Sequence, residues 1–283
     1  MKKPITLVYE PTISVIASQA LDDEGIETMV EWVKSHRPEC LPDNYVYWLD
    51  LFPHDGCRND SSYEALTDNE LLAELCGREC YHSFGKKAGR KSNREYIKNT
   101  QSGDIAHNSI LYHCKMTFFI AGVSRRVSHE LIRNYVGSDR DEEGSPSQES
   151  TRYTHHYGHY IVHPRDLNDK HEIDKFKSDM QHNYDIYCGY IDRQVSKYKQ
   201  EYKKEPKGMD RKRIYEAASQ RLDHACETSW IWTTNPVALM KLFRERTHEA
   251  ADLEIQRLAN KWKRLCLERW PNLFVRMEME NKV

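Results

Sequence analysis

The sequence predicts an α+β protein that combines long helices with a mixed β-sheet. Residues 169–204 form a long charged stretch of helical character, whereas residues 5–17 and 113–123 are β-branched or alternate in hydrophobicity. The chain has 283 residues, of which 39% are hydrophobic, enough for a sizeable buried core. It carries neither a glycine-rich dinucleotide fingerprint nor a GKS/GKT phosphate loop, so any nucleotide or flavin must bind outside those two folds.

Strand and helix patterns alternate in the first half of the chain. One or two strands are expected at 5–17, followed by an amphipathic helix whose acidic start and basic end suit the helix dipole. Prolines and a glycine then predict a loop, and a basic stretch separates the next helix from the second strand region. The expected elements after the first strands are helix 22–37, loop 37–62, helix 62–81, basic segment 85–97, strand 113–123 and helix 124–136.

Helices dominate the second half. Gly, Ser, Asp and Pro residues predict a loop at 137–149, and the histidine- and tyrosine-rich residues 150–164 favour an extended segment. We then expect three helices, at 169–204, 208–224 and 236–269. No internal repeat or low-complexity tract interrupts this order.

Charge and composition exclude several classes of function. The formal net charge is −2, so no large basic field indicates DNA or RNA binding, although local arginines can still bind a small anion. No run of 18 apolar residues predicts a membrane span, and the first residues are too polar for a signal peptide. None of the eight cysteines forms a CxxC pair, so we interpret them as reduced thiols of a cytoplasmic protein.

An arginine lies within the apolar stripe of the last predicted helix. Arg246 is seven residues from two leucines of a stripe composed of Leu239, Leu242, Phe243, Ala250 and Leu253. A cation in such a stripe is costly unless it meets a polar or anionic group. It is either a structural ion-pair partner of Asp252 or Glu249, or a ligand arginine that reaches a phosphate or a carbonyl edge.

The helix at 124–136 has a polar face of the same kind. Arg126, His129, Glu130 and Arg133 share this face, opposite the packing residues Val123, Val127 and Leu131. Such a face is either simply solvated or part of a site, because the helix leads directly into a segment rich in Ser, Gln, Glu and Arg. The following histidines 155, 156, 159 and 163 are either a metal cluster or, as we expect, a strand end without metal.

Six segments in one order resemble the flavin-dependent thymidylate synthases. They are GRECYHS (77–83), AHNSILYHCKMTFFIAGVSR (106–125), SHELIRN (128–134), SQESTRY (147–153), WIWTTNPVALMKLFRER (230–246) and ADLEIQRLA (251–259). The resemblance covers roughly residues 70–160 and 215–272. It implies a single domain over 1–283, with additions at about 18–66 and 165–205.

The resemblance also implies an activity and its cofactors. Family members are homotetramers that bind FAD at subunit interfaces, stacked on the pyrimidine of dUMP. NADPH reduces the flavin, methylenetetrahydrofolate provides the carbon, and dTMP is released. The expected partner is therefore a small nucleotide, with neither nucleic acid nor membrane.

Individual roles follow only where this sequence matches the family. Arg246 is expected to polarise the pyrimidine, and Ser150 is expected to act with it at the catalytic centre. The expected cofactor-binding residues are His107, Ser109, Arg133, Asn134, Tyr135, Gln148, Asn235 and Lys241. The expected substrate-binding residues are Glu130, Arg133, Gln148, Glu149, Ser150, Thr151, Arg152, Arg221 and Arg246.

The chain departs from the family pattern around its signature. Arg133-Asn134-Tyr135 replaces R-H-R, and the spacing from Arg133 to Ser150 is seven residues longer. We expect residues 137–144 to form an ordered lid over the nucleotide, with a glycine hinge at each end. Three functions remain open: a thymidylate synthase, a flavoenzyme that modifies another pyrimidine nucleotide or adds another one-carbon unit, and a non-catalytic nucleotide-binding homologue.

Overall fold

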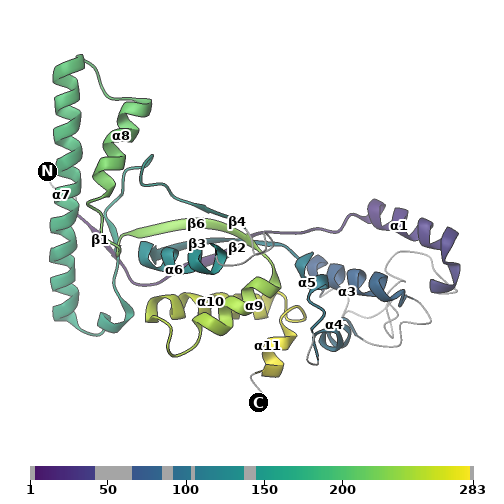
Figure 1. Cartoon of the computed structure of the whole chain (residues 1–283). Coiled ribbons are helices and arrows are strands. Elements are labelled where there is room, and N and C mark those ends of the chain that lie inside the picture. The colour runs from purple at the N-terminus through teal and green to yellow at the C-terminus, as the bar shows by residue number, and fades with distance from the viewer. Residues whose placement is uncertain (1–3, 42–65, 85–91, 103–105, 137–144, 281–283) are drawn as a thin grey trace.

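An antiparallel four-stranded sheet forms the centre of the molecule in the computed structural model, which describes residues 4–41, 66–84, 92–102, 106–136 and 145–280 (Figure 1). The side chains of residues 40, 132–136 and 145 are not described. The strands follow the order β2 (Thr12–Ser18), β3 (Met116–Ser124), β6 (Glu227–Thr234) and β4 (Ser145–Gln148). Together with the helices, this sheet confirms the predicted α+β class.

A second, smaller sheet contains the only parallel pairing among the described residues. In it, β1 (Thr6–Val8) runs parallel to β5 (His159–Ile161). The expectation of one mixed sheet was therefore wrong, because the parallel and antiparallel pairs occupy separate sheets. An isolated bridge between Tyr160 and Cys226 links the middle of β5 to the residue before β6.

Alternation along the central strands decides which face of the sheet is buried. Phe118 lies opposite Trp232, and Ile120 opposite Trp230, and all four side chains are buried. Helices α6 (Arg125–Val136), α9 (Pro236–Arg246) and α10 (Leu253–Arg269) cover this face (Figure 1). Trp262 of α10 makes edge contacts with the rings of Phe118 and Trp232. Burial of these large rings is the main stabilisation of the sheet–helix layer.

The remaining helices gather at the two ends of the sheet (Figure 1). At one end lie α1 (Asp23–His36), α3 (Asp68–Tyr81), α4 (Asn93–Gln101) and α5 (Ser109–Tyr112), with α11 (Val275–Glu280) packed against α4. At the other end, α7 (Lys170–Tyr202) packs against α8 (Gly208–Ser219). Short 3-10 turns occur at Pro38–Cys40 and Pro164–Asp166. Within the described ranges, no helix has the length and apolar character needed to cross a membrane.

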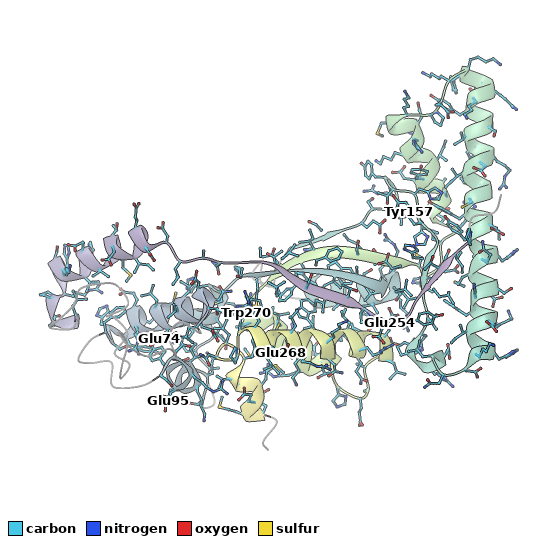
Figure 2. All side chains as sticks on the ribbon, turned by 180° about the vertical axis from the view of Figure 1, so that it is seen from behind. Glu74, Glu95, Tyr157, Glu254, Glu268 and Trp270 are labelled. Atoms are coloured by element: carbon cyan, nitrogen blue, oxygen red, sulfur yellow. The ribbon has the colours of Figure 1, made fainter. Side chains whose placement is uncertain are left out.

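A buried polar network ties the C-terminal segment to α3 and α4. Glu74 and Arg78 form a fully buried ion pair on α3, and Asn93 of α4 donates to Glu74 and to the carbonyl of Glu70. Asn272 donates its backbone N–H to the Glu70 carboxylate. Figure 2 places Trp270, the residue after α10, between this helical group and the strands.

Three predicted segments differ in their secondary structure. Residues 145–148 form β4 rather than part of a loop, because they pair with β6, a strand that the sequence analysis did not assign. Residues 150–164 are mostly not extended, since a turn at 151–154 precedes β5. The helix predicted for 208–224 ends at Ser219.

The helix predicted for 236–269 is two helices. The side chain of Asp252 accepts the N–H of Glu254 and thereby begins α10 anew. Ala250 and Leu253 therefore do not continue the buried stripe of α9, and Leu253 is 41% exposed. Leu239, Leu242 and Phe243 are buried as predicted.

Candidate active site

Arg246 is the last residue of α9, and its side chain faces α6. Its guanidinium Nη1 lies 4.0 Å from the Glu130 carboxylate, and the two side chains are only 21% and 25% exposed. This partner is neither Asp252 nor Glu249, the two acids considered from sequence. Two residues that the resemblance assigns to the nucleotide therefore come together from helices far apart in the chain.

An ion-pair network joins α6 to the start of α10 beside this pair. Arg126 donates from both terminal nitrogens to Asp252, at 2.8 Å each, and lies 3.3 Å from Glu254. Glu254 is buried and also accepts the backbone N–H and the hydroxyl of Ser124, at 2.7 and 2.8 Å. Burial would raise the pKa of Asp252, but the N–H of Glu254 and the Arg126 guanidinium together lower it. We name the side chains of Ser124, Arg126, Asp252 and Glu254 the α6–α10 clamp.

The α6–α10 clamp fixes the far end of the loop that follows Arg246. Thr247 caps α9 through the carbonyl of Phe243, and Asp252 begins α10, so only a short loop separates Arg246 from the clamp. Figure 2 shows Glu254 at the end of the sheet that faces α7. A bidentate arginine–carboxylate contact restricts orientation as well as distance, so the clamp holds the start of α10 in register with α6.

The segment after β4 turns sharply and exposes its charged side chains. The backbone N–H groups of Tyr153 and Thr154 both donate to the carbonyl of Ser150. Arg152 is 59% exposed and lies 3.8 Å from Glu216 of α8. The turn therefore places Ser150, Thr151 and Arg152 together at the edge of the sheet, beside α8. This grouping is suited to holding an anion.

Glu149 lies between the strands and this turn. Its backbone N–H bonds to Ser229, its carboxylate accepts the hydroxyl of Thr154, and Arg125 donates to its carbonyl at 2.9 Å. Burial, followed by the nearby charge of Glu227, raises the pKa of Glu149. The neighbouring Gln148 points to the other side of β4, where it donates to the buried Thr228. Adjacent residues of the predicted site thus occupy opposite faces.

A buried histidine anchors the rest of the segment to α7. The N–H of His156 donates to the hydroxyl of Tyr187, and the hydroxyl of Tyr184 donates to its carbonyl. Its ring Nδ1 accepts the N–H of Gly158, which lies at φ +79°, a backbone conformation that favours glycine. Burial, with a smaller contribution from the neighbouring His159 and Arg125, lowers the pKa of His156 to about 4. His155 packs against the same tyrosines, and within the described ranges no group of three His, Cys, Asp or Glu side chains is placed to hold a metal ion.

The predicted cofactor residues on or just before α5 and α9 lie at the other end of the sheet (Figure 1). His107 contacts the hydroxyl of the exposed Tyr81 through Nδ1 at 3.2 Å, and Ser109 is exposed at the start of α5. Lys241 is exposed on the neighbouring α9. Asn235 is fully buried, and its side chain caps α9 by accepting the N–H of Ala238.

Several predicted residues are not placed with these groups. Arg221 donates to the carbonyl of Ala217, and its guanidinium stacks on Tyr190 of α7, 3.8 Å from the ring centre. The backbone of Arg133, Asn134 and Tyr135 belongs to α6, but their side chains lie outside the described part of the chain. The insert 137–144 also lies outside it.

Two groups of residues that support the candidate site were not predicted from the sequence. The α6–α10 clamp was not predicted, although Arg126 was placed on the polar face of its helix. Arg125, which supports Glu149, and Lys212, which lies 3.3 Å from Glu216, were not singled out. The available signal was the pair of acids at 252 and 254 immediately before a new helical period, which is a typical helix start.

Comparisons with known proteins agree with the resemblance. Residues 63–272 match the family described as thymidylate synthase complementing protein. The flavin-dependent thymidylate synthase of Mycolicibacterium vanbaalenii is 31% identical over 211 residues, which cover 74% of this chain and 79% of the relative. The corresponding enzyme of Corynebacterium aurimucosum is 29% identical over 214 residues, covering 75% and 81%.

A solved structure shows that the fold extends beyond the matched residues. The UMP/dUMP methylase PolB from Streptomyces cacaoi, bound with 5-Br dUMP, has a TM-score of 0.52 at 16% identity, and the match covers 97% of each chain. At this identity the match supports the fold alone. The family match and the sequence relatives nevertheless each span about three quarters of the chain. This chain therefore belongs to the family of flavin-dependent thymidylate synthases.

Proposed function

We propose that this enzyme methylates dUMP at C5 to give dTMP, with a bound FAD, NADPH as reductant and methylenetetrahydrofolate as carbon donor. The observation that carries the proposal is the meeting of Arg246 and Glu130 in a half-buried position. The resemblance assigns Arg246 to the pyrimidine and Glu130 to a contact with dUMP, and the two residues come from different helices. A coincidental pairing of these two positions would need a separate explanation.

The chemistry of Arg246 suits the pyrimidine ring. C5 of uracil is a weak nucleophile, and it gains reactivity when negative charge on the O4 and N3 edge is stabilised. A guanidinium in a partly desolvated place stabilises such charge strongly, and its planar fork matches a carbonyl edge. Glu130 provides a negative charge 4.0 Å from this guanidinium, and the α6–α10 clamp ties α6 to the start of α10 beside it.

The turn at Ser150 suits the phosphate of the nucleotide. A hydroxyl, exposed backbone groups and the Arg152 guanidinium together make a charge-assisted binding site. Arg152 is exposed, so an incoming phosphate can reach it without unfolding the turn.

The residues on α5 and α9 fit a flavin. An imidazole, a hydroxyl and an ammonium group, from His107, Ser109 and Lys241, suit its carbonyls, ring nitrogens and diphosphate. When bound, the flavin supplies the redox chemistry, and the protein supplies its orientation. Because these residues and the Ser150 turn lie at opposite ends of the central sheet within one chain, we propose that each site is completed between copies in a homotetramer.

The decisive measurement combines a spectrum with a product assay. The purified protein should be yellow, its flavin absorption should change when dUMP is added, and it should convert dUMP to dTMP with all three cofactors present. Light scattering should give a tetramer. A colourless protein that binds dUMP without converting it would instead favour the non-catalytic nucleotide-binding alternative.

A second candidate substrate is UMP. The fold match to PolB extends over nearly the whole chain, and that protein is described as a UMP/dUMP methylase. Competition between UMP and dUMP for the same turnover separates the two substrates. Rescue of a thymidine auxotroph by this gene should occur only if dUMP is used.

A further inference from the structure

Two cations from separate elements share one carboxylate oxygen beside the Ser150 turn. Arg152 Nη1, on the turn, lies 3.8 Å from Glu216 Oε1, and Lys212 Nζ, one helical turn earlier on α8, lies 3.3 Å from the same oxygen. The two positive charges therefore face a single negative charge. Such a group carries a local excess of +1, which favours a doubly charged anion over a carboxylate.

Tyr153 holds the two cations on one side of the turn. The Arg152 guanidinium carbon lies 5.7 Å from the centre of its ring, and the Lys212 ammonium lies 5.0 Å from it. Only 16% of the Lys212 side chain is exposed, and its ammonium group lies against the Tyr153 ring. Lys212 is thus directed at the same place as Arg152, and not into open solvent.

We propose that Lys212 is a second ligand of the nucleotide phosphate held by Arg152, and that Glu216 occupies the place of that phosphate until the nucleotide displaces it. The proposal rests on the proposed function, which places the phosphate at Arg152. A phosphate dianion matches both cations at once, whereas the Glu216 carboxylate neutralises only one. Nucleotide affinity is therefore set by competition between two anions for one cation pair.

The test compares dUMP with deoxyuridine, which lacks the phosphate, by calorimetric titration of the full-length protein. Lys212→Ala should weaken dUMP binding about 10-fold, the loss of one charge-assisted contact, and leave deoxyuridine binding unchanged. Glu216→Gln should have the opposite sign and tighten dUMP binding several-fold, because the competing anion is gone. Lys175→Ala is the matched control, since Lys175 and Asp179 form a lysine–acid pair of the same helical spacing on α7.

Each outcome decides a separate part of the proposal. Equal effects of Lys212→Ala on dUMP and deoxyuridine, or no effect on either, would refute the phosphate role of Lys212. Weaker or unchanged dUMP binding by Glu216→Gln would refute the competition and identify Glu216 as a structural partner. If the wild-type protein binds no dUMP, the proposed substrate fails, and the same variants titrated with UMP and inorganic phosphate then test the cation pair alone. In that case, unchanged binding of UMP and inorganic phosphate by Lys212→Ala would refute the role of the cation pair in anion binding.

Discussion

The two halves of the candidate site are held by different physical chemistry. Around Arg246, charged side chains cross from α6 to the α9–α10 junction, and the main restraint is the bidentate contact of Arg126 with Asp252. Around Ser150, a neutral buried histidine and two tyrosines hold the backbone, while the charged side chain of Arg152 is exposed. His163 links the halves, 3.4 Å from Asp252.

This difference indicates a division of labour. A group that stabilises charge developing on a ring must be oriented before the reaction, which the α6–α10 clamp achieves for Arg246. A group that binds a phosphate must exchange it with solvent, so its charges remain accessible. We therefore expect changes in the first half to alter turnover and changes in the second half to alter affinity or pH response.

The largest expected effect is on turnover and concerns Arg246. Arg246→Lys keeps the charge but loses the planar fork, and the loss of such a donor typically lowers turnover by about 100-fold or more. Nucleotide affinity and melting temperature should change little. Steady-state kinetics and a thermal melt on the same variant check both statements. A destabilised variant with unchanged turnover per folded site would make Arg246 only a structural partner of Glu130.

Acid should loosen the Ser150 half first. The pKa of His156 is lowered to about 4 in the folded protein, against ~6.5 for an ordinary histidine, so the unfolded chain binds the proton more readily. Stability is complete above the unfolded pKa and falls as the pH decreases from ~6.5 towards the folded pKa, with a loss of ~2 kcal/mol by pH 5. Urea unfolding at pH 8 and pH 5 measures this loss.

A variant assigns the acid response to this histidine. In His156→Gln, the part of the acid-induced loss of stability that protonation of His156 causes should disappear. The lowered pKa of Asp252 implies that its stabilising contacts fail only below the ordinary carboxyl range, so the α6–α10 clamp should survive at pH 5. An identical acid response in His156→Gln and wild type would place the sensitive group elsewhere.

Breaking the clamp should have a smaller effect. Arg126→Ala leaves Asp252 and Glu254 without their cation, which should cost ~1 kcal/mol because the arginine is partly solvated. Turnover should also fall several-fold while dUMP affinity stays near wild type. Arg257→Ala is the control, since it removes an ion pair between α10 and Glu10, whose side chain is 66% exposed. Equal effects of the two variants on turnover would show that the clamp does not position Arg246.

Sequence patterns predicted well those elements whose periodicity is local. The helix at Lys170–Tyr202 and the strand at Met116–Ser124 match their predicted ranges closely, because helical period and alternation are properties of neighbouring residues. The packing face of α6 was predicted for the same reason, and Val123, Val127 and Leu131 are buried.

Features that depend on distant residues were less accessible. Strand β6 has the apolar inner face of a strand, but its assignment depends on pairing with β3 and β4. The break after α9 depends on the cap at Asp252. The hydrophobic period alone continues across this break and therefore does not predict it. The apolar stripe that drew attention to Arg246 ends at the helix break. Arg246 is nevertheless mostly buried, because it faces Glu130 on another helix, and the sequence pattern could not show this contact.

The smallest expected effect sharpens the comparison within the Ser150 half. Burial and Glu227 raise the pKa of Glu149, so the folded protein binds its proton more readily than the unfolded chain does. Its ionised form is therefore destabilising, and this destabilisation is present above the folded pKa and absent below the ordinary carboxyl pKa. Glu149→Gln, which imitates the protonated group, should raise the melting temperature slightly at pH 7.5 and have no effect near pH 3.5. The exposed Glu31→Gln on α1 provides the control, and if Glu149→Gln lowered the melting temperature at pH 7.5, the attraction of Arg125 would outweigh the repulsion of Glu227.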